Sequence, residues 1–329
     1  MLRIHFTSED LIRTRVAAAA DPMWEIVLSL HILQTRRPAF TLDKWRREVR
    51  GRFTDQRRRG QLARLMPLAP IATYMPDFLT PSHAAGNLVE GIDAVLSTPP
   101  PRLRREMQRL GAVSRLPAWA GELAAGKSDP LHNLGKALGD YHRFALAPYW
   151  HHIQERVDTD RTARGQALLD GGPEHLLETL SPQTSWRRPV LEINYPVDRD
   201  LRLDGRGITL LPSFFCQTYP ITLADVTLPP VLVYPIAQAG FPSAPTAEGL
   251  SALLGATRAA ILVATRPGRS TGELAKLLNV SAGTVSYHVS ALRDAELVIS
   301  RRNANMVVHT TTPLGGKLLH GRHQSTTRP

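Results

Sequence analysis

The stretch from Asn279 to Leu297, NVSAGTVSYHVSALRDAEL, constrains the fold most, because its apolar residues recur at helical spacing. Val285, Val289 and Leu292 fall at positions i, i+4 and i+7, so they share one face of a helix. Ser281 precedes them at the position where a hydroxyl caps a first turn. The stretch therefore predicts a short amphipathic helix that begins after Ser281.

A second short helix is predicted immediately before this one. Ser270-Thr271-Gly272-Glu273 has the S-x-x-E pattern of a capping box. Leu274, Leu277 and Leu278 would then form its inner face. Only two residues, beginning with Asn279, connect the helices, and asparagine readily takes the left-handed conformation that ends a helix. The pair therefore predicts a helix-turn-helix.

The flanking segments extend this unit. Residues 247–264 predict a preceding helix, and residues 298–311, VISRRNANMVVHTT, predict two strands around a polar turn. Thr312-Pro313 predicts the start of a last short helix. The inner stripe of the preceding helix would consist of Leu250, Leu254, Thr257 and Ile261. Helix, helix-turn-helix, hairpin and helix is the element order of a winged helix.

This segment resembles the ArsR-type winged helix of bacterial transcriptional regulators. The resemblance rests on ELAKLLNVSAGTVSYHVSALRDAELV, on the basic wing that follows, and on TTPLG. It covers the last quarter of the chain and implies a homodimer that binds double-stranded DNA at an inverted repeat. By resemblance alone, it also implies a repressor.

Candidate DNA contacts lie on the second helix and on the wing. They are Ser281, Gly283, Thr284, Ser286, Tyr287, His288, Arg293, Arg301, Arg302, Asn303 and Asn305. Hydroxyls can bond phosphates or base edges, glycine permits close approach, and a basic wing suits the DNA backbone or minor groove. No Arg, Gln or Asn lies on the first two turns, so sequence preference would depend on Tyr287, His288 and DNA shape. Packing beside Val285 is the alternative role of His288.

Positive charge is concentrated at the two ends of the chain, whose net charge is +11. Residues 1–65 carry 14 Lys and Arg against 7 Asp and Glu, and residues 247–329 carry 10 against 4, whereas residues 66–246 carry 16 against 18. A phosphate-binding surface requires such an excess. The N-terminal runs Arg46-Arg47 and Arg57-Arg58-Arg59 have a second interpretation, a solvated arginine-rich face, and the sequence leaves that choice open.

Cysteine content and hydropathy indicate the compartment. The chain has one cysteine, which excludes a disulfide framework and fits a reducing cytoplasm. No apolar run approaches the length of a membrane span, and the N-terminus lacks the apolar core of a signal peptide. We expect a cytoplasmic protein without a membrane partner.

A metal sensor is the obvious alternative within the ArsR resemblance. Thiolate-type relatives carry Cys-x-Cys just before the helix-turn-helix, where this chain has Ser270 and Gly272, which cannot bind a soft metal. Cys216 is expected to be a buried small hydrophobe. His320 and His323 could share a face of the last helix, but the tail from residue 321 is expected to be disordered. We predict no metal site and no cofactor.

The region before the winged helix is predicted to be mostly helical with a small β-sheet, which makes the chain α+β. Residues 8–65, 102–125 and 131–169 read mostly as helix, the last interrupted by Pro148. From Pro189 to Pro235 the runs VLEINY, GITLLP and VLVYP predict strands, with which LRIHF could pair. A possible core stripe comprises Trp24, Val27, Leu28 and Ile32. A hairpin turn is expected at Gly205 and Gly207.

Three parts follow from this pattern: an N-terminal domain at 1–245 with its β-rich part at about 189–236, a winged helix at 246–320, and a tail at 321–329. FPSAP at 241–245 is the expected linker. The N-terminal part resembles the uncharacterised domain that precedes ArsR-type winged helices in larger bacterial regulators. That resemblance is carried by MLRIHFTSEDLIRTRVA, PDFLTP, LAPYW, ALLDGG, YPVDRDLRLDGRGITLLPSFF and LPPVLVYP.

The role expected of the N-terminal domain is sensing of a small-molecule effector in an apolar pocket. The candidate pocket wall consists of Tyr141, Tyr149, Trp150, His152, Phe214 and Phe215. An ordinary hydrophobic core is the alternative use of these aromatic residues.

Catalysis is not expected. His151-His152 with Glu155 and Asp158 is the best constellation, but it lacks the H-E-x-x-H arrangement of two ligands and a base on one face. The chain contains no G-x-S-x-G and no phosphate loop.

The alternative to DNA binding is a winged helix that binds protein, with the N-terminal part as scaffold. The basic wing favours DNA.

Overall fold

The computed structural model describes residues 1–329 except 36–40, 82–86, 218, 237–246, 304–305 and 321–329. The chain divides into two compact units, Met1–Phe241 and Pro242–Pro329. The linker predicted at 241–245, and with it the boundary after residue 245, lies outside the described residues, as does the tail from 321. Helices in both units together with several small sheets confirm the predicted α+β class.

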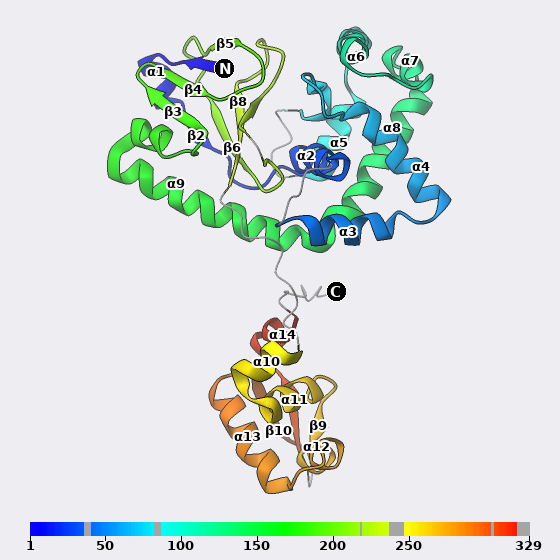
Figure 1. Cartoon of the computed structure of the whole chain (residues 1–329), viewed down its shortest axis with the longest axis vertical. Helices are drawn as coiled ribbons and strands as arrows, with labels where there is room; N and C mark the ends of the chain where they lie inside the picture. Colours follow the sequence, from blue (N-terminus) through cyan, green and yellow to red (C-terminus); the bar gives the residue numbers. More distant parts are fainter. Residues whose placement is uncertain (36–40, 82–86, 218, 237–246, 304–305, 321–329) are drawn as a thin grey trace. The chain divides into compact units, whose positions relative to one another are not determined.

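Helices form much of the N-terminal unit (Figure 1). The α-helices are α1 Ser8–Ile12, α2 Pro22–Gln34, α3 Asp43–Arg52, α4 Gln56–Leu65, α5 Leu88–Leu96, α6 Pro100–Val113, α7 Trp119–Ala124, α8 Ser128–Tyr141 and α9 Trp150–Glu178. Shorter turns are η1 Met66–Leu68, η2 Asp77–Leu79, η3 His142–Leu146 and η4 Ala147–Tyr149. The interruption expected at Pro148 is confirmed, since η3 and η4 separate α8 from α9 there.

The β-rich part of this unit takes the form of two four-stranded sheets among the described residues. The strands are β1 Leu2–His5, β2 Arg15–Val16, β3 Thr184–Arg187, β4 Val190–Ile193, β5 Arg199–Arg202, β6 Thr209–Ser213, β7 Ile221–Thr222 and β8 Val231–Pro235. One sheet has the order β3-β4-β1-β5 and the other β2-β6-β8-β7. The pairing predicted for LRIHF is confirmed, because β1 lies antiparallel to β4 and parallel to β5.

The turn that contains Gly205 and Gly207 connects β5 of one sheet to β6 of the other, so the predicted hairpin turn is wrong. Gly207 has φ +68, and a Cβ there would lie 2.5 Å from the Cβ of Arg13. Its N–H donates to Oδ1 of Asp10 at 2.8 Å. Glycine is required at this position because the turn approaches the end of α1 closely.

α2 lies centrally in the unit, between the sheets and the helices α4 to α8 (Figure 1). Trp24, Val27, Leu28 and Ile32 are all buried, which confirms the predicted core stripe. The opposite side of α2 is also buried, as Met23, Ile26 and Leu30 show. A helix that is buried all round is the centre of a core rather than its lid.

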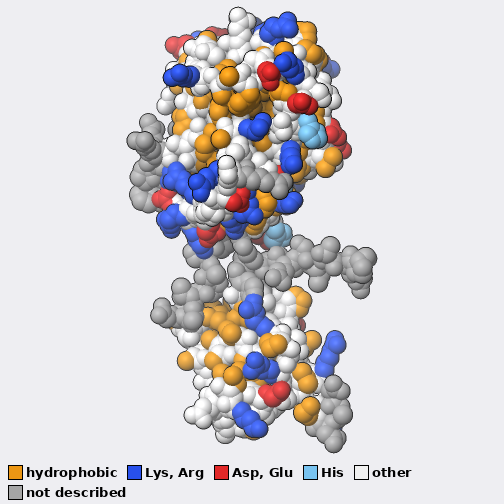
Figure 2. All heavy atoms as spheres, turned by 90° about the vertical axis from the view of Figure 1, so that its right-hand side faces the viewer, with side chains coloured by type: hydrophobic (Ala, Val, Ile, Leu, Met, Phe, Trp, Pro, Cys, Tyr) orange, Lys and Arg blue, Asp and Glu red, His pale blue; other side chains and the backbone are white. Residues whose placement is uncertain are grey.

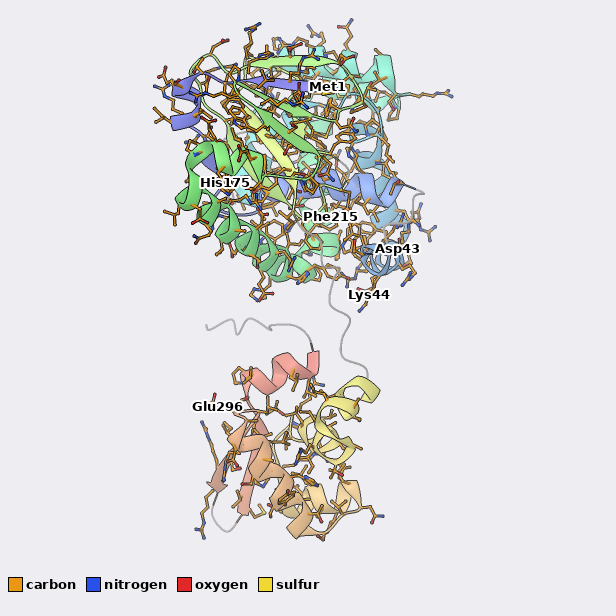
Figure 3. All side chains as sticks on the ribbon, turned by 60° about the vertical axis from the view of Figure 1, so that its left-hand side comes forward. Met1, Asp43, Lys44, His175, Phe215 and Glu296 are labelled. Carbon is orange, nitrogen blue, oxygen red and sulfur yellow. The ribbon has the colours of Figure 1, made fainter. Side chains whose placement is uncertain are left out.

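A buried carboxylate ties α2 to the segment after β6. Glu25 accepts hydrogen bonds from the backbone amides of Phe214 (2.8 Å) and Phe215 (3.0 Å) and from the hydroxyl of Ser213 (3.1 Å). Burial raises the pKa of Glu25 to about 7, although the three donors oppose that rise. Phe215 is labelled in Figure 3. The LPSFF segment is therefore held against α2 by hydrogen bonds to Glu25.

Asp77 plays the equivalent role for η2. Its carboxylate accepts from the backbone amides of Ala224 (2.8 Å) and Asp225 (2.7 Å), in the loop between β7 and β8. Asp77 is buried, and burial raises its pKa. PDFLTP, one of the motifs that carry the resemblance, thus docks the helical part onto the loop of a sheet.

The C-terminal unit has the predicted order of elements. They are α10 Ala247–Leu254, α11 Ala256–Ala264, β9 Arg269–Ser270, α12 Thr271–Leu278, α13 Ala282–Asp294, β10 Val298–Asn303, β11 Met306–Thr311 and α14 Pro313–His320. The single helix predicted at 247–264 is wrong, because Gly255 at φ +85 divides it into α10 and α11. Of the stripe predicted there, Leu250 and Ile261 are buried, Leu254 packs against the core, and Thr257 is half-buried.

The start of the last helix is confirmed. The hydroxyl of Thr312 accepts from the amide of Gly315 at 3.0 Å, and Pro313 occupies the first turn. A Cβ on Gly315 would lie 2.2 Å from the carbonyl oxygen of Leu297. Glycine therefore allows α14 to approach the start of β10 closely.

Candidate nucleic-acid interface

Side-chain caps fix both helices of the helix-turn-helix. Ser270 Oγ accepts from the amide of Glu273 (3.3 Å), and the Glu273 carboxylate accepts from the amide of Ser270 (2.7 Å). α12 then ends at Asn279 in the left-handed conformation, with φ 53 and ψ 48. Ser281 caps α13 by accepting from the amide of Thr284 at 3.0 Å. All three predicted caps are confirmed, and they mark where α12 begins and ends and where α13 begins.

The prediction that Leu274, Leu277 and Leu278 form the inner face of α12 is partly wrong. Leu274 is buried and Leu278 packs against the core of the unit, but Leu277 is 52% exposed. The i, i+3, i+4 pattern allows two adjacent residues on the inner face, and α12 places only the second of them there.

α13 buries one face and exposes the other. Val285, Val289 and Leu292 are buried as predicted, whereas Ser286 is exposed and Tyr287 is 68% exposed. The other candidate contacts described on this helix or its cap are Ser281, Gly283 and Arg293, which are exposed, and Thr284 and His288, which are half-buried. The exposed surface is polar and carries small side chains, which suits close approach to a groove.

His288 has features of both of its proposed roles. Its ring is half-buried and lies 5.2 Å from the ring of Tyr287 in an edge arrangement. Its Nδ1 is buried without a hydrogen-bond partner among the described residues. The ring is therefore in contact with Tyr287 and remains partly accessible.

The wing presents two arginines. β10 pairs antiparallel with β11, so that Arg301 lies opposite Val308 and Arg302 opposite Val307, and both arginines are exposed. Asn303 ends β10, but its side chain is not described, and Asn305 lies outside the described residues. The described part of the wing therefore holds two cations at its surface.

Sequence reasoning missed the strand β9, which pairs with β11 and makes the wing sheet three-stranded, with the order β10-β11-β9. It also missed His309 of β11, whose buried ring lies 2.8 Å from Ser300 Oγ. A two-residue strand and a single histidine carry no periodic signal. Burial and the nearby charge of Arg293 lower the pKa of His309.

Two polar residues of the helix-turn-helix that the sequence analysis did not name are also at the surface. Ser290 is half-exposed one turn beyond Ser286, and Lys276 is exposed on α12. The i+4 spacing from Ser286 could have identified Ser290, because residues four apart share a helix face. Lys276 adds a cation beside the turn.

The positions considered for metal binding have other roles or lie outside the described part of the chain. Ser270 caps α12 and Gly272 is exposed, while the side chain of His320 and all of His323 are not described. Cys216 is buried, and burial raises the pKa of its thiol. The described residues include no group of three or more His, Cys, Asp or Glu placed to hold a metal ion.

The aromatic residues proposed as a pocket wall are packed together in the N-terminal unit. The structure brings His152 and Phe214 into edge contact at 5.6 Å. The Tyr141 hydroxyl lies 2.9 Å from Ser29 Oγ. The most buried of the six are Tyr141, Tyr149, Phe214 and Phe215, and Trp150 packs against the same core. The aromatic segment at 141–152 thus packs against Phe214 within the hydrophobic core of the unit.

The constellation considered for catalysis is a set of helix-surface pairs. His151 Nε2 lies 3.0 Å from Glu155 Oε1, and both side chains are more than half exposed. Asp158 lies 3.4 Å from Arg161 one turn further along α9. Such i, i+3 and i, i+4 pairs are ordinary on exposed helices.

Comparison with known proteins identifies one region. A family model described as a helix-turn-helix domain matches residues 253–301, from the end of α10 into β10. No curated protein and no solved structure matches the chain. Together with the wing sheet, the match identifies a winged helix-turn-helix, a domain typical of DNA-binding regulators. Separately, none of the helices in the described ranges has the length and apolar character needed to cross a membrane.

Proposed function

We propose that this protein is a cytoplasmic DNA-binding transcriptional regulator of the ArsR type that occupies its operator as a homodimer and represses transcription. The observation that carries the proposal is the exposed polar face of α13 with Arg301 and Arg302 exposed on the wing of the same unit. The helix-turn-helix match over residues 253–301 supports it. We also propose that the N-terminal unit is the domain that precedes the winged helix in larger ArsR-type regulators.

α13 is the recognition helix in this mechanism. Its exposed Ser286 and Tyr287 contact base edges in the major groove, while the wing arginines bind phosphate oxygens. A two-fold dimer then reads two half-sites about 34 Å apart, one helical turn of DNA. Because α13 offers no bidentate donor on its first two turns, DNA shape contributes to the choice of operator.

The N-terminal unit is the regulatory part of the proposal, and it acts without catalysis, metal or cofactor. A small organic molecule held by the aromatic segment around Tyr149 and Phe214 would control the dimer. Such an effector changes DNA affinity only by the difference in its own affinity for the two states of the protein.

A protein-binding winged helix is the second candidate. Exposed apolar side chains on the wing favour it: Ile299 is 41% exposed, Met306 59% and Val307 41%. The adjacent arginine pair favours DNA, because guanidinium groups bind phosphates in pairs of hydrogen bonds.

Selection of genomic fragments by the purified full-length protein tests the choice. We expect enrichment of one inverted-repeat sequence by the wild type and a lower recovery of the same sequence by the Arg301→Gln, Arg302→Gln variant. No enrichment over random fragments would contradict DNA readout. The recovered operator then allows a panel of metabolites to be titrated, and we expect one class of small molecule to change operator affinity several-fold.

A further inference from the structure

The arginine-rich segment of the N-terminal unit has no role in the function proposed above. Residues 43–65, which form α3 and α4, contain nine Lys and Arg against three Asp and Glu, a net charge of +6. Figure 2 shows lysine and arginine side chains gathered on the lower part of this unit as drawn. The structure shows how these charges are held.

Three guanidinium groups converge on Phe144. The guanidinium carbons of Arg58 and Arg143 lie 4.4 and 5.2 Å from the centroid of its ring. Arg52 donates to the carbonyl oxygen of Phe144 at 2.9 Å, and Arg58 donates to the carbonyl oxygen of Arg52 at 3.0 Å. Contacts to a backbone oxygen and to an aromatic face orient Arg52 and Arg143 without neutralising them, whereas Arg58 is also paired with Asp55.

The carboxylates of the segment are already engaged. Asp43 pairs with Arg46, whose side chain is almost fully buried. Asp55 caps α4 and pairs with Arg58 at 3.1 Å. Glu48 accepts a hydrogen bond from the hydroxyl of Tyr149.

Five exposed arginines of α3, α4 and η3 form no ion pair among the described residues: Arg47, Arg50, Arg59, Arg64 and Arg143. The Nε of Arg59 is anchored on the carbonyl oxygen of Thr54 at 2.7 Å, which again leaves the charge uncompensated. Like charges held close together repel one another, and a polyanion that binds there relieves the repulsion.

We infer that this surface, the α3–α4 arginine face, binds the phosphate backbone of double-stranded DNA. It consists of Arg47, Arg50, Arg52, Arg58, Arg59 and Arg143. The inference rests on the proposed function, since the same chain then binds DNA through its winged helix. Oriented guanidinium groups bind phosphate oxygens in pairs of hydrogen bonds. Gly51, Gly60 and Ala63 are exposed on the same helices and allow the DNA backbone to approach.

DNA fits this surface better than a lipid membrane does. The described residues of α3 and α4 include no exposed large apolar side chain that could enter a bilayer. A backbone contact carries no sequence information, so the face adds affinity for any duplex and leaves the choice of operator to α13.

Salt titration of four full-length proteins on a random-sequence duplex tests the inference. They are the wild type, the face variant Arg47→Gln, Arg59→Gln, Arg143→Gln, the wing variant Arg301→Gln, Arg302→Gln, and the control Arg104→Gln, Arg115→Gln, Arg202→Gln. The control arginines are exposed on the same N-terminal unit. For the face variant we expect the slope of log affinity against log salt to fall by about 2 to 3 and affinity to fall about tenfold or more. The control should stay within about twofold of the wild type.

Each arm separates one conclusion from another. A face variant that keeps the wild-type slope, or a control that loses as much as the face variant, would overturn the inference while a weakened wing variant still upholds the proposed function. If only the face variant loses binding, the inference holds and the winged-helix assignment fails. Tighter binding of wild type to duplex RNA than to DNA, through the same arginines, would overturn the assignment to DNA.

A charge-retaining variant guards against misfolding. Arg47→Lys, Arg59→Lys, Arg143→Lys should keep most of the salt slope, because each lysine still displaces a counterion. All five tryptophans lie in the N-terminal unit, so their emission reports its folding in every variant. A lysine variant that is folded but has lost the slope as fully as the glutamine variant would contradict a role based on charge.

Discussion

The imidazole Nε2 of His309 lies 2.9 Å from the hydroxyl oxygen of Thr271, which joins the wing to the first turn of the helix-turn-helix. The other ring nitrogen bonds Ser300 on the neighbouring wing strand at 2.8 Å. Hydroxyl groups can donate or accept, so they satisfy a neutral ring in either tautomer. This buried ring therefore fixes the wing relative to α12.

Replacing the ring should loosen the wing. For His309→Ala we expect a loss of about 2 to 4 kcal/mol in the stability of the winged helix, from two hydrogen bonds and a cavity. DNA affinity should fall with it, because the wing arginines lose their fixed position. Hydrogen exchange of the β10 and β11 amides measures the first effect and a DNA titration the second. Ser300→Ala, which removes one of the two bonds, should show a smaller loss; equal protection in all three proteins would refute the role of His309.

Glu25 and His309 should contribute to the stability of their units with opposite pH dependence. The folded pKa of His309 is lowered, so its contribution to stability is lost as pH falls below the unfolded value near 6.5. The folded pKa of Glu25 is raised from 4.5 to about 7, so protonation of this group favours the folded N-terminal unit, and its contribution to stability is lost as pH rises through that window. The change is on the order of 3 kcal/mol. Tryptophan emission during urea unfolding at several pH values follows the N-terminal unit alone.

A single substitution isolates the carboxyl group. Glu25→Gln should remove the contribution of Glu25, so the stability of the N-terminal unit should fall less, or rise more, between about pH 4.5 and 7 than it does in the wild type. The substitution should also lower the stability of the unit by about 1 to 3 kcal/mol. The backbone amides of Phe214 and Phe215 donate to different carboxylate oxygens, and the NH2 group that replaces one of these oxygens cannot accept a hydrogen bond. The remaining slope would come from Asp21, whose pKa burial raises to about 6, and, with the opposite sign, from His31 and His142, whose pKa values burial lowers to about 4. An unchanged pH profile in the variant would show that Glu25 does not titrate in this range.

Sequence preference should depend on the exposed face of α13. Ser286→Ala and Tyr287→Ala should change the preferred sites more than they change affinity for random DNA, since these side chains lie where a recognition helix meets base edges. Selection of random sites by each variant would show it. A uniform loss of affinity with the same preferred site would mean that both residues contact only the backbone.

Metal should not control DNA binding. Ser270 and Gly272 occupy the positions at which thiolate-type relatives carry cysteines, so a chelator or added zinc should leave operator affinity within error. A zinc-dependent loss of binding that disappears in a His320→Ala, His323→Ala variant would contradict this.

The local signals of the winged helix predicted it well. Capping side chains such as Ser270, Ser281 and Thr312 bond to amides within a few residues, so sequence spacing alone determines those contacts. The face of Leu277 was predicted incorrectly because burial of one leucine among several depends on packing against other helices. Gly255 was overlooked because it lies within an alanine- and leucine-rich run.

The N-terminal unit was harder to predict because its decisive contacts are distant in sequence. Glu25 bonds to residues nearly two hundred positions away, and Gly207 donates to Asp10 over a similar separation. Nothing in the local pattern reports such pairs. The runs that contain β1, β4, β6 and β8 were recognisable from the sequence, whereas the short or polar strands β2, β3, β5 and β7 were not. The division of the strands between two sheets depends on long-range contacts.

The salt dependence of operator binding by Arg301→Gln, Arg302→Gln, with Arg104→Gln, Arg115→Gln as the matched control, tests the central claim that the winged helix binds DNA. The account predicts weaker binding of the wing variant to every sequence, with a slope against log salt about 2 lower than that of wild type, and an unchanged control. A wing variant that binds its operator with the wild-type affinity and slope would contradict it.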